Sequence, residues 1–151
     1  LITGVDIVRT QIMVAAGEKL PFTQREINNR MRGHAIECRI NAEDPYNFMP
    51  SPGRVTMWHM PGGPGVRVDS HVYNNYFVPP NYDSMIGKLI VYGDTREQAL
   101  ARMRTALSEV GGEGIKTNVP LHQDLMVDAA FAEGGTNIHY LEHWLEQRKK
   151  R

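Results

Sequence analysis

The stretch GHAIECRINAEDP, residues 33–45, decides how this chain folds. As a strand it sends successive side chains to opposite sides, because a strand repeats every two residues. One side is mostly apolar and is predicted to face the core, whereas the other carries a carboxylate and a guanidinium. The apolar side comprises His34, Ile36, Cys38 and Ile40, and the polar side comprises Ala35, Glu37, Arg39 and Asn41.

Glu37 and Arg39 stand two residues apart on the polar side of this strand. Such a pair is typical of a surface ion pair with no further role. The alternative is an arginine held rigidly in a cleft, where its planar, permanently charged guanidinium recognises an anion or a developing oxyanion. Alternation alone does not decide between the two interpretations.

Short runs broken by Pro and Gly turns follow the first strand. The further strand candidates are 54–59, 65–70 and 88–92, and the glycine-rich stretch 61–65 is predicted to be a turn between two of them. Several short strands without helices between them indicate an antiparallel sheet or a partial barrel. Because helical segments come before and after the strands, the predicted fold class is α+β.

The spacing of apolar residues predicts helices on both sides of the strands. One is expected over 4–16, with Thr3 and Asp6 as a capping box, and another over 95–110, starting at Thr95. Pro120 predicts a shorter helix that extends to about residue 129. Thr136 is expected to cap a last helix, whose inward side carries Ile138, Leu141 and Leu145.

Residues 20–32 show no clear periodicity and predict a surface connection. We therefore expect a division into an N-terminal unit, residues 1–31, and a main domain, residues 32–151. The chain begins with Leu1 rather than Met, which suggests a piece of a longer protein.

The composition excludes several classes of protein. The chain has 151 residues, of which 41% are hydrophobic and 23% charged, as in ordinary globular proteins. Seventeen basic residues balance seventeen acidic ones, so no electrostatic footprint for nucleic acid or an anionic membrane is expected. No apolar run approaches the roughly 18 residues of a membrane span. A single cysteine, Cys38, suits a reducing, cytoplasmic location.

Two further features are weak signals. His139 and His143 lie four residues apart, a spacing that lets two imidazoles share a metal ion. A third ligand is missing, so ordinary exposed histidines are expected and no metal site is predicted. The basic run 148–151 is interpreted as a solvated helix end.

The motif RGHAIECRINAEDP, residues 32–45, closely resembles the segment that opens the C-terminal domain of biotin carboxylases. The resemblance continues through nearly the whole chain in the family's order, and the first predicted helix resembles one in the family's ATP-grasp domain. It implies a barrel-sandwich-like domain, of the single-hybrid-motif type, with flanking helices. The further motifs are PSPG at 50–53, PGG at 61–63, GVR at 65–67, YDSMIGKL at 82–89, GIKTN at 114–118 and GGTN at 134–137.

The resemblance assigns roles to a few residues. Arg39 matches the catalytic arginine that faces the ureido oxygen of biotin, where negative charge builds as the N–H is lost. Tyr82 and Asp83 match a segment near this arginine and are expected to support the biotin pocket, with plain packing as the alternative. Arg67 matches the dimer-forming surface, with a solvated strand arginine as the alternative. Glu37 is expected to belong to the scaffold around Arg39.

The resemblance also implies what this chain lacks. In the family's order, the residues that bind ATP, magnesium and bicarbonate precede Leu1, so the chain alone is expected to be inactive. The implied substrate is carrier-linked biotin, and the implied partners are the biotin carboxyl carrier protein, a second copy of the enzyme and carboxyltransferase subunits. The chain ends soon after GGTN, which favours the biotin carboxylase subunit of acetyl-CoA carboxylase, in fatty acid synthesis. The alternatives are the equivalent domain of a pyruvate or propionyl-CoA carboxylase, or a non-catalytic module for dimerisation and carrier docking.

Overall fold

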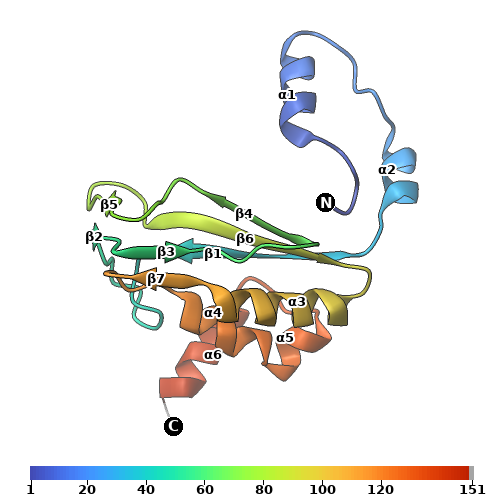
Figure 1. The fold of residues 1–151 in the computed structure, drawn as a ribbon. Coiled ribbons are helices and arrows are strands. Elements are labelled where there is room, and N and C mark those ends of the chain that lie inside the picture. The colour runs from blue at the N-terminus through green and yellow to red at the C-terminus, as the bar shows by residue number, and fades with distance from the viewer. Residues whose placement is uncertain (150–151) are drawn as a thin grey trace.

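A three-stranded antiparallel sheet forms the centre of the computed structural model, which describes residues 1–149 (Figure 1). Its order is β1 (His34–Asn41), β6 (Met85–Gly93) and β4 (Val66–Ser70). Helix α3 (Arg96–Glu109) lies against β6 and β1, and the other C-terminal helices gather on the same side of the sheet. The opposite side of the sheet carries no helix of this group.

The alternation predicted for residues 34–41 is confirmed from Ile36 onward, whereas His34, predicted on the same side, is exposed. Ile36, Cys38 and Ile40 are buried, and they lie opposite Val91, Leu89 and Gly87 of β6. Leu89 and Val91 are fully buried and reach the same core as the apolar side of α3. The buried side chains of α3 are Ala99, Leu100, Met103, Ala106 and Leu107.

Two short ribbons extend the sheet region. The strand predicted over 54–59 divides into β2 (Gly53–Arg54) and β3 (Met57–His59), because Val55 between them turns fully into the core. β2 pairs with β5 (Phe77–Val78), and β3 pairs with β7 (Gly111–Glu113). Neither β5 nor β7 was expected from the sequence, since β7 begins at the glycines predicted only to end a helix.

The helix predicted over 95–110 is confirmed as α3, and the Thr95 side chain accepts a hydrogen bond from Gln98 N. The helix predicted from Pro120 to residue 129 is wrong in length. It divides into α4 (Val119–Met126) and α5 (Ala129–Glu133), because Asp128 between them caps α5 through Phe131 N. A single continuous helix would have no such break.

The last helix, α6 (Tyr140–Lys149), begins later than predicted. Asn137, not Thr136, supplies the nearby side-chain acceptor, at 2.9 Å from His139 N. Ile138 precedes the helix and is 90% exposed, so its predicted inward position is wrong.

Polar contacts fasten α6 to the body of the domain. Trp144 Nε1 donates to Asp128 at 3.2 Å, and Arg148 pairs with Asp124 and lies over the ring of Tyr46. Arg148 is therefore not simply solvated, as the basic run 148–151 suggested. Residues 150–151 of that run lie outside the described part of the chain.

The N-terminal unit consists of α1 (Ile7–Ala15) and α2 (Gln24–Arg30), which stand away from the sheet (Figure 1). The helix predicted over about 4–16 is present as α1 but begins three residues later. Asp6 alone caps it, through Arg9 N, and Thr3 instead accepts from Val5 N, so the predicted capping box is wrong. The expectation of a surface connection over 20–32 missed α2, which Thr23 and Glu26 begin with a capping box.

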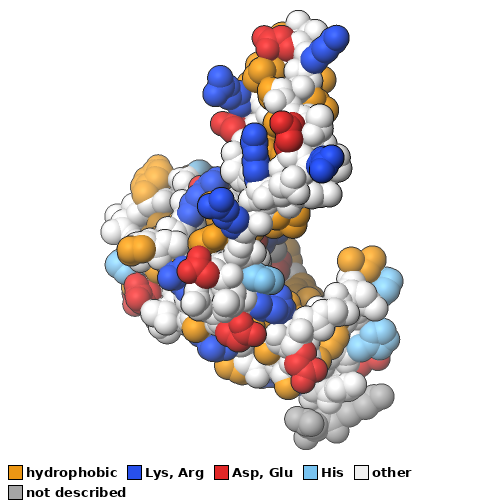
Figure 2. Space-filling model, turned by 90° about the vertical axis from the view of Figure 1, so that its right-hand side faces the viewer, with side chains coloured by type: hydrophobic (Ala, Val, Ile, Leu, Met, Phe, Trp, Pro, Cys, Tyr) orange, Lys and Arg blue, Asp and Glu red, His pale blue; other side chains and the backbone are white. Residues whose placement is uncertain are grey.

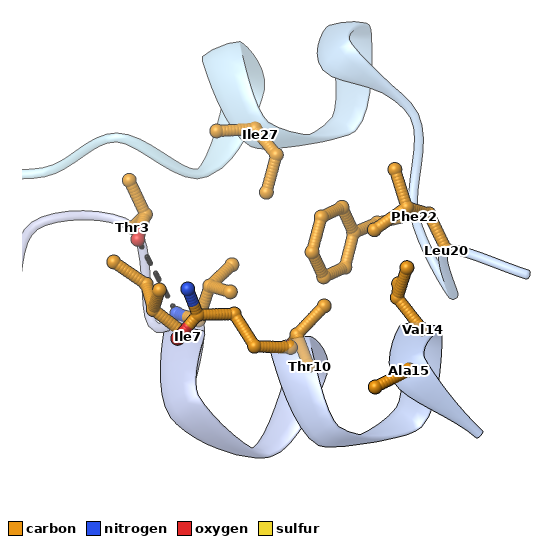
Figure 3. A pocket seen from close by; sticks show the side chains of 10 residues that line it. Thr3, Ile7, Thr10, Val14, Ala15, Leu20, Phe22 and Ile27 are labelled. Atoms are coloured by element: carbon orange, nitrogen blue, oxygen red, sulfur yellow. Dashed lines mark hydrogen bonds between the residues drawn. The ribbon is translucent and has the colours of Figure 1, made fainter. Parts of the chain in front are cut away.

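An apolar hollow separates α1 from α2. Figure 3 shows Ile27 of α2 pointing toward α1, Val14 of α1 pointing toward α2, and the Phe22 ring projecting into the space between the two helices. The hollow measures about 560 Å³, and none of the residues in either helix is buried. The two helices thus contribute nothing to the core of the main domain.

The predicted α+β class with an antiparallel sheet is confirmed by this arrangement. Within residues 1–149, no helix is both long and apolar enough to cross a bilayer.

Gly33, which introduces β1, has a positive φ of 64°, and a Cβ atom there would lie 2.5 Å from the carbonyl oxygen of Gly93. We expect Gly33→Ala to lose about 1–2 kcal/mol of unfolding free energy from the left-handed backbone. The overlap adds a further cost of about 1–3 kcal/mol. Urea unfolding of the variant measures both together.

Gly135→Ala is the matched control, because Gly135 has φ 77° and no atom within 4 Å of the added Cβ. Its loss of unfolding free energy should reflect the left-handed backbone conformation alone. Equal losses in the two variants would contradict the close approach of Gly33 to β6.

Candidate functional site

The sheet surface turned away from α3 carries five charged side chains, which we name the charged sheet face: Glu37, Arg39, Arg67, Asp69 and Lys88. Strand register arranges them in rows. Lys88 of the central strand lies between Arg39 and Asp69, and Ile90 lies between Glu37 and Arg67. Figure 2 shows basic and acidic side chains interleaved over the body of the domain. The surface is therefore mixed in sign.

Arg39 is available to a ligand. Its Nε lies 3.8 Å from Glu37 Oε1, while its side chain remains 69% exposed. An exposed pair at this distance contributes little to stability. Glu37 thus lies beside the guanidinium, as expected of its scaffold, without occupying its hydrogen-bonding capacity.

Arg67 has a partner within its own strand. Its Nε and Nη2 donate to the two carboxylate oxygens of Asp69, at 3.0 and 2.7 Å. This bidentate hydrogen bonding lowers the pKa of Asp69. The pair gives the edge strand β4 a fixed, charged surface, and its predicted part in a dimer stays a prediction.

Asn118 holds the end of β1 from outside the sheet. Its Oδ1 accepts from Asn41 N at 2.8 Å, and its Nδ2 donates to the Arg39 carbonyl oxygen at 3.0 Å. Asn118 stands at the start of α4 but makes no side-chain cap there. It is the one buried polar residue in the described part of the chain, with 6% exposure.

His122, one turn along α4, contacts the same carbonyl. Its Nε2 lies 2.8 Å from the Arg39 oxygen, and because a carbonyl only accepts, Nε2 carries the proton. Burial lowers the pKa of His122, partly offset by this hydrogen bond and by the charge of Glu43. The neutral imidazole is therefore the form that fits the site.

The sequence did not identify either residue as part of the site. GIKTN at 114–118 marks the position of Asn118, and Pro120 indicates that a helix begins there. Neither signal shows that the carboxamide reaches a strand 77 residues away.

Tyr82 and Asp83 lie at the turn that leads into β6. The Tyr82 side chain is 81% exposed, and Asp83 Oδ1 accepts from Met85 N at 2.8 Å. The residue that follows them joins the two strands directly, because the Ser84 carbonyl accepts from Ala42 N. Among the described residues, no hydrogen bond or ion pair links Tyr82 or Asp83 to the Arg39 side chain. The structure thus places both near the end of β1.

Glu43 ties this turn to β1. It accepts from Ser84 Oγ at 3.0 Å and from Asn41 Nδ2 at 3.2 Å. Asn41 Oδ1 is buried without a hydrogen-bond partner among residues 1–149. The polar end of β1 is thus held by Glu43 on one side and by Asn118 on the other.

The cysteine thiol and the histidine pair noted in the sequence form neither a reactive thiolate nor a metal site among the described residues. Burial raises the pKa of Cys38 to about 12, which keeps the thiol protonated. His139 and His143 are exposed, with His139 paired to Glu142. Within the described residues, no three His, Cys, Asp or Glu side chains gather as metal ligands.

Comparison with known protein families identifies the family of the main domain. The family model described as the biotin carboxylase C-terminal domain matches residues 37–143. The chain belongs to this family. The match includes Arg39, Tyr82 and Asn118. It starts within β1, covers β4, β6 and helices α3 to α5, and ends within α6.

Curated relatives carry the same domain in longer proteins. The biotin carboxylase of Pseudomonas aeruginosa is 60% identical over 149 residues, covering 99% of this chain and 33% of the relative. A pyruvate carboxylase subunit from Methanothermobacter thermautotrophicus is 54% identical, covering 95% of this chain and 29% of the relative. The chain thus spans about a third of the length of the curated relatives it matches.

Solved structures share the fold. A biotin carboxylase subunit of pyruvate carboxylase has a TM-score of 0.88 and 44% identity, over 96% of this chain and 32% of that one. The biotin carboxylase domain dimer of Hydrogenobacter thermophilus 2-oxoglutarate carboxylase, in complex with MgADP, ADP and bicarbonate, has a TM-score of 0.87. It is 47% identical, over 94% of this chain and 31% of that one.

Acid should destabilise the biotin carboxylase C-terminal domain partly through His122. Folding lowers the pKa of His122, so the unfolded chain, with a pKa of about 6.5, binds the proton more tightly. Unfolding free energy contributed by this group is therefore present above pH 6.5 and falls as the pH drops toward the lower folded pKa. We expect His122→Gln to lose less stability than the wild type between pH 7.5 and 5.5, in urea titrations at each pH. Equal pH slopes in the two proteins would contradict the buried, neutral imidazole.

Proposed function

We propose that this chain forms the biotin-facing side of the active site of a biotin carboxylase, and that Arg39 is its catalytic residue. The reaction proposed for the full-length enzyme carboxylates carrier-linked biotin with ATP, magnesium and bicarbonate. The other residues of that active site would come from the rest of the enzyme, so this chain alone is expected to be inactive. The observation that carries the proposal is an exposed guanidinium within the matched family segment, on a residue whose backbone carbonyl Asn118 holds.

The proposed chemistry explains why an arginine stands at this position. Bicarbonate is activated by ATP to carboxyphosphate, which releases CO₂ and phosphate. Biotin loses its ureido N–H proton to a catalytic base that the rest of the enzyme would supply. The negative charge spreads onto the ureido oxygen, and the nitrogen attacks CO₂. A guanidinium aimed at that oxygen stabilises the charge where it develops. Arg39 presents a planar fork of donors, which a lysine ammonium does not.

Tyr82 and Asp83 are proposed to support the biotin pocket. Both lie where β6 begins, beside the strand end that carries Arg39. A shallow hollow of about 110 Å³ adjoins Tyr82, and its lining includes Pro50, Pro80 and Ser84. The exposed phenol ring would cover a ligand that enters from the charged sheet face, and Asp83 would hold the turn through Met85 N.

The proposed partners follow from the family. They are the biotin carboxyl carrier protein, carboxyltransferase subunits and a second copy of the enzyme, with the assembly in the cytoplasm. Arg67 is proposed to lie in the surface shared by the two copies. Its ion pair with Asp69 fixes the guanidinium on the edge strand β4, where a partner surface would find it already ordered.

The final acceptor of the carboxyl group is proposed to be acetyl-CoA, in fatty acid synthesis, with biotin carboxylation as the first step of acetyl-CoA carboxylation. The alternative is that the chain belongs to a pyruvate or propionyl-CoA carboxylase. The 54% identity to the pyruvate carboxylase subunit of Methanothermobacter thermautotrophicus supports the pyruvate carboxylase alternative. Since the acceptor reacts on a carboxyltransferase, carboxylation assays of the full-length enzyme with purified acetyl-CoA and pyruvate transferase partners distinguish the two.

Arg39→Ala in the full-length enzyme is expected to lower kcat for biotin carboxylation about 10²- to 10³-fold, the usual cost of one lost donor to a developing oxyanion. Arg39→Lys should restore only a small part of this loss, because an ammonium lacks the fork geometry. The affinity for ATP should stay within about twofold of the wild type. Steady-state rates of carboxybiotin formation and nucleotide titrations measure these quantities.

Arg54→Ala is the control, since Arg54 is another exposed strand arginine and lies on β2, outside the central sheet. It should leave kcat unchanged. Full turnover by Arg39→Ala would overturn the proposal.

Arg67→Glu is expected to weaken the proposed dimer at least tenfold. The substitution breaks the ion pair with Asp69 and places two carboxylates side by side on β4, in a surface that would be desolvated. Sedimentation equilibrium of the full-length enzyme measures the dissociation constant. Arg54→Glu reverses the same charge outside the central sheet and should leave it unaltered. A dimer equally tight in both variants would refute the interface.

A further inference from the structure

The free side of β1 requires partners that the sheet does not supply. In the order β1-β6-β4, β1 is an edge strand. Its backbone N–H and C=O groups alternate between β6 and the free side, and those on the free side need other partners when they lie away from water. Arg39 O, Asn41 N and Asn41 O all point to this free side, because they bond to α4 and not to β6.

Asn118 completes this edge with its side chain. The carboxamide donates to Arg39 O at 3.0 Å and accepts from Asn41 N at 2.8 Å, the pair of bonds that one residue of a neighbouring parallel strand would make. The backbone N of Asn118 adds a third bond, to Asn41 O at 3.2 Å. One residue thus replaces a missing strand over the two positions that flank Ile40.

His122 adds a second donor to the same oxygen. Its Nε2 lies 2.8 Å from Arg39 O and 3.2 Å from Asn118 Nδ2. Since Asn118 and His122 lie on successive turns of the start of α4, the helix approaches Arg39 as a rigid unit.

Arg39 needs this support because neither the pairing of β1 with β6 nor side-chain packing fixes its position well. The ladder between β1 and β6 shifts register between Ile40 and Asn41, one residue beyond Arg39. The Arg39 side chain is mostly exposed, and its Glu37 contact is long, so packing does not fix its direction. The Arg39 carbonyl carbon is bonded directly to the Cα atom that carries the guanidinium, so bonds to that carbonyl set where the side chain starts.

We propose that Asn118 and His122 are positioning residues that aim Arg39 by fixing its carbonyl group. This inference rests on the catalytic role proposed for Arg39. Neither residue touches the substrate, and each acts only through the arginine. A displacement of about 1 Å at a reacting group costs up to about 10²-fold in rate, so loss of the two donors should be visible in turnover.

The test uses the full-length enzyme with saturating ATP and bicarbonate and with biotin varied. Asn118→Ala is expected to lower kcat about 10- to 100-fold, with KM for ATP unchanged. His122→Phe should lower kcat in the same direction, whereas His122→Gln, which retains a donor, should recover most of the activity. Should Asn118→Ala fail to fold, the two His122 variants decide the question alone. Equal losses in His122→Phe and His122→Gln would overturn the role of the donor.

Gln123→Ala is the matched control. Gln123 lies on the same helix and also uses its side chain to hold a carbonyl, that of Leu107 at 3.1 Å, but it makes no bond to β1. It should lower the thermal stability without changing kcat. An equal fall of kcat in Gln123→Ala and Asn118→Ala would show a merely structural role and overturn the inference.

The double variant Arg39→Ala, Asn118→Ala separates this inference from the proposed function. If Asn118 acts through Arg39, the double variant should turn over as slowly as Arg39→Ala alone, because effects within one unit are not additive. A further 10-fold loss in the double variant would overturn the inference and leave the role of Arg39 intact. Normal turnover by Arg39→Ala alone would instead overturn the proposed function.

Discussion

Antiparallel pairing of β1 with β6 is the constraint on which the rest of the main domain depends. Because the register is fixed, Ile36, Cys38 and Ile40 face α3, and their neighbours face away from it. A slip of one residue would bring Glu37 and Arg39 into the core and expose the apolar side chains. The cost of burying those charges excludes this slip. The same register that builds the core therefore also presents the arginine.

The charged sheet face is a consequence of this pairing and of a second strand pair. β4 joins the other edge of β6, so Asp69 and Arg67 lie in rows with Arg39 and Glu37. The Arg67 guanidinium is paired with the Asp69 carboxylate of the same strand, at hydrogen-bonding distance. Arg39 makes only a long contact with Glu37 and keeps its donors exposed. Two arginines on one surface thus have different capacities for a ligand, which the number of charges alone does not reveal.

The parts of the fold that sequence predicts well are those with local causes. Alternation along residues 34–41 and the apolar spacing of residues 96–109 predicted β1 and α3, because each pattern reports the face that one element buries. The resemblance located Arg39 through its motif. β5 and β7 were missed because strands of two and three residues exist only through their partners. The missed α2 did have a local signal, since Thr23 and Glu26 form its capping box.

Long-range contacts account for what the sequence could not supply at the site. Pro120 indicated that a helix begins close to Asn118, but the Asn118 carboxamide bonds to β1 rather than to its own helix. Ile138 fitted an apolar spacing, yet the helix that would have buried it begins two residues later. In both cases the outcome depends on which surface lies nearby, and periodicity contains no such information.

ATP cleavage by the full-length enzyme, measured with and without free biotin in the presence of bicarbonate, tests the central claim most directly. A biotin carboxylase of the kind proposed here should cleave ATP in a bicarbonate-dependent reaction that free biotin stimulates. Bicarbonate-dependent cleavage that does not respond to biotin would indicate a different carboxylating or amidating ligase and would contradict the account.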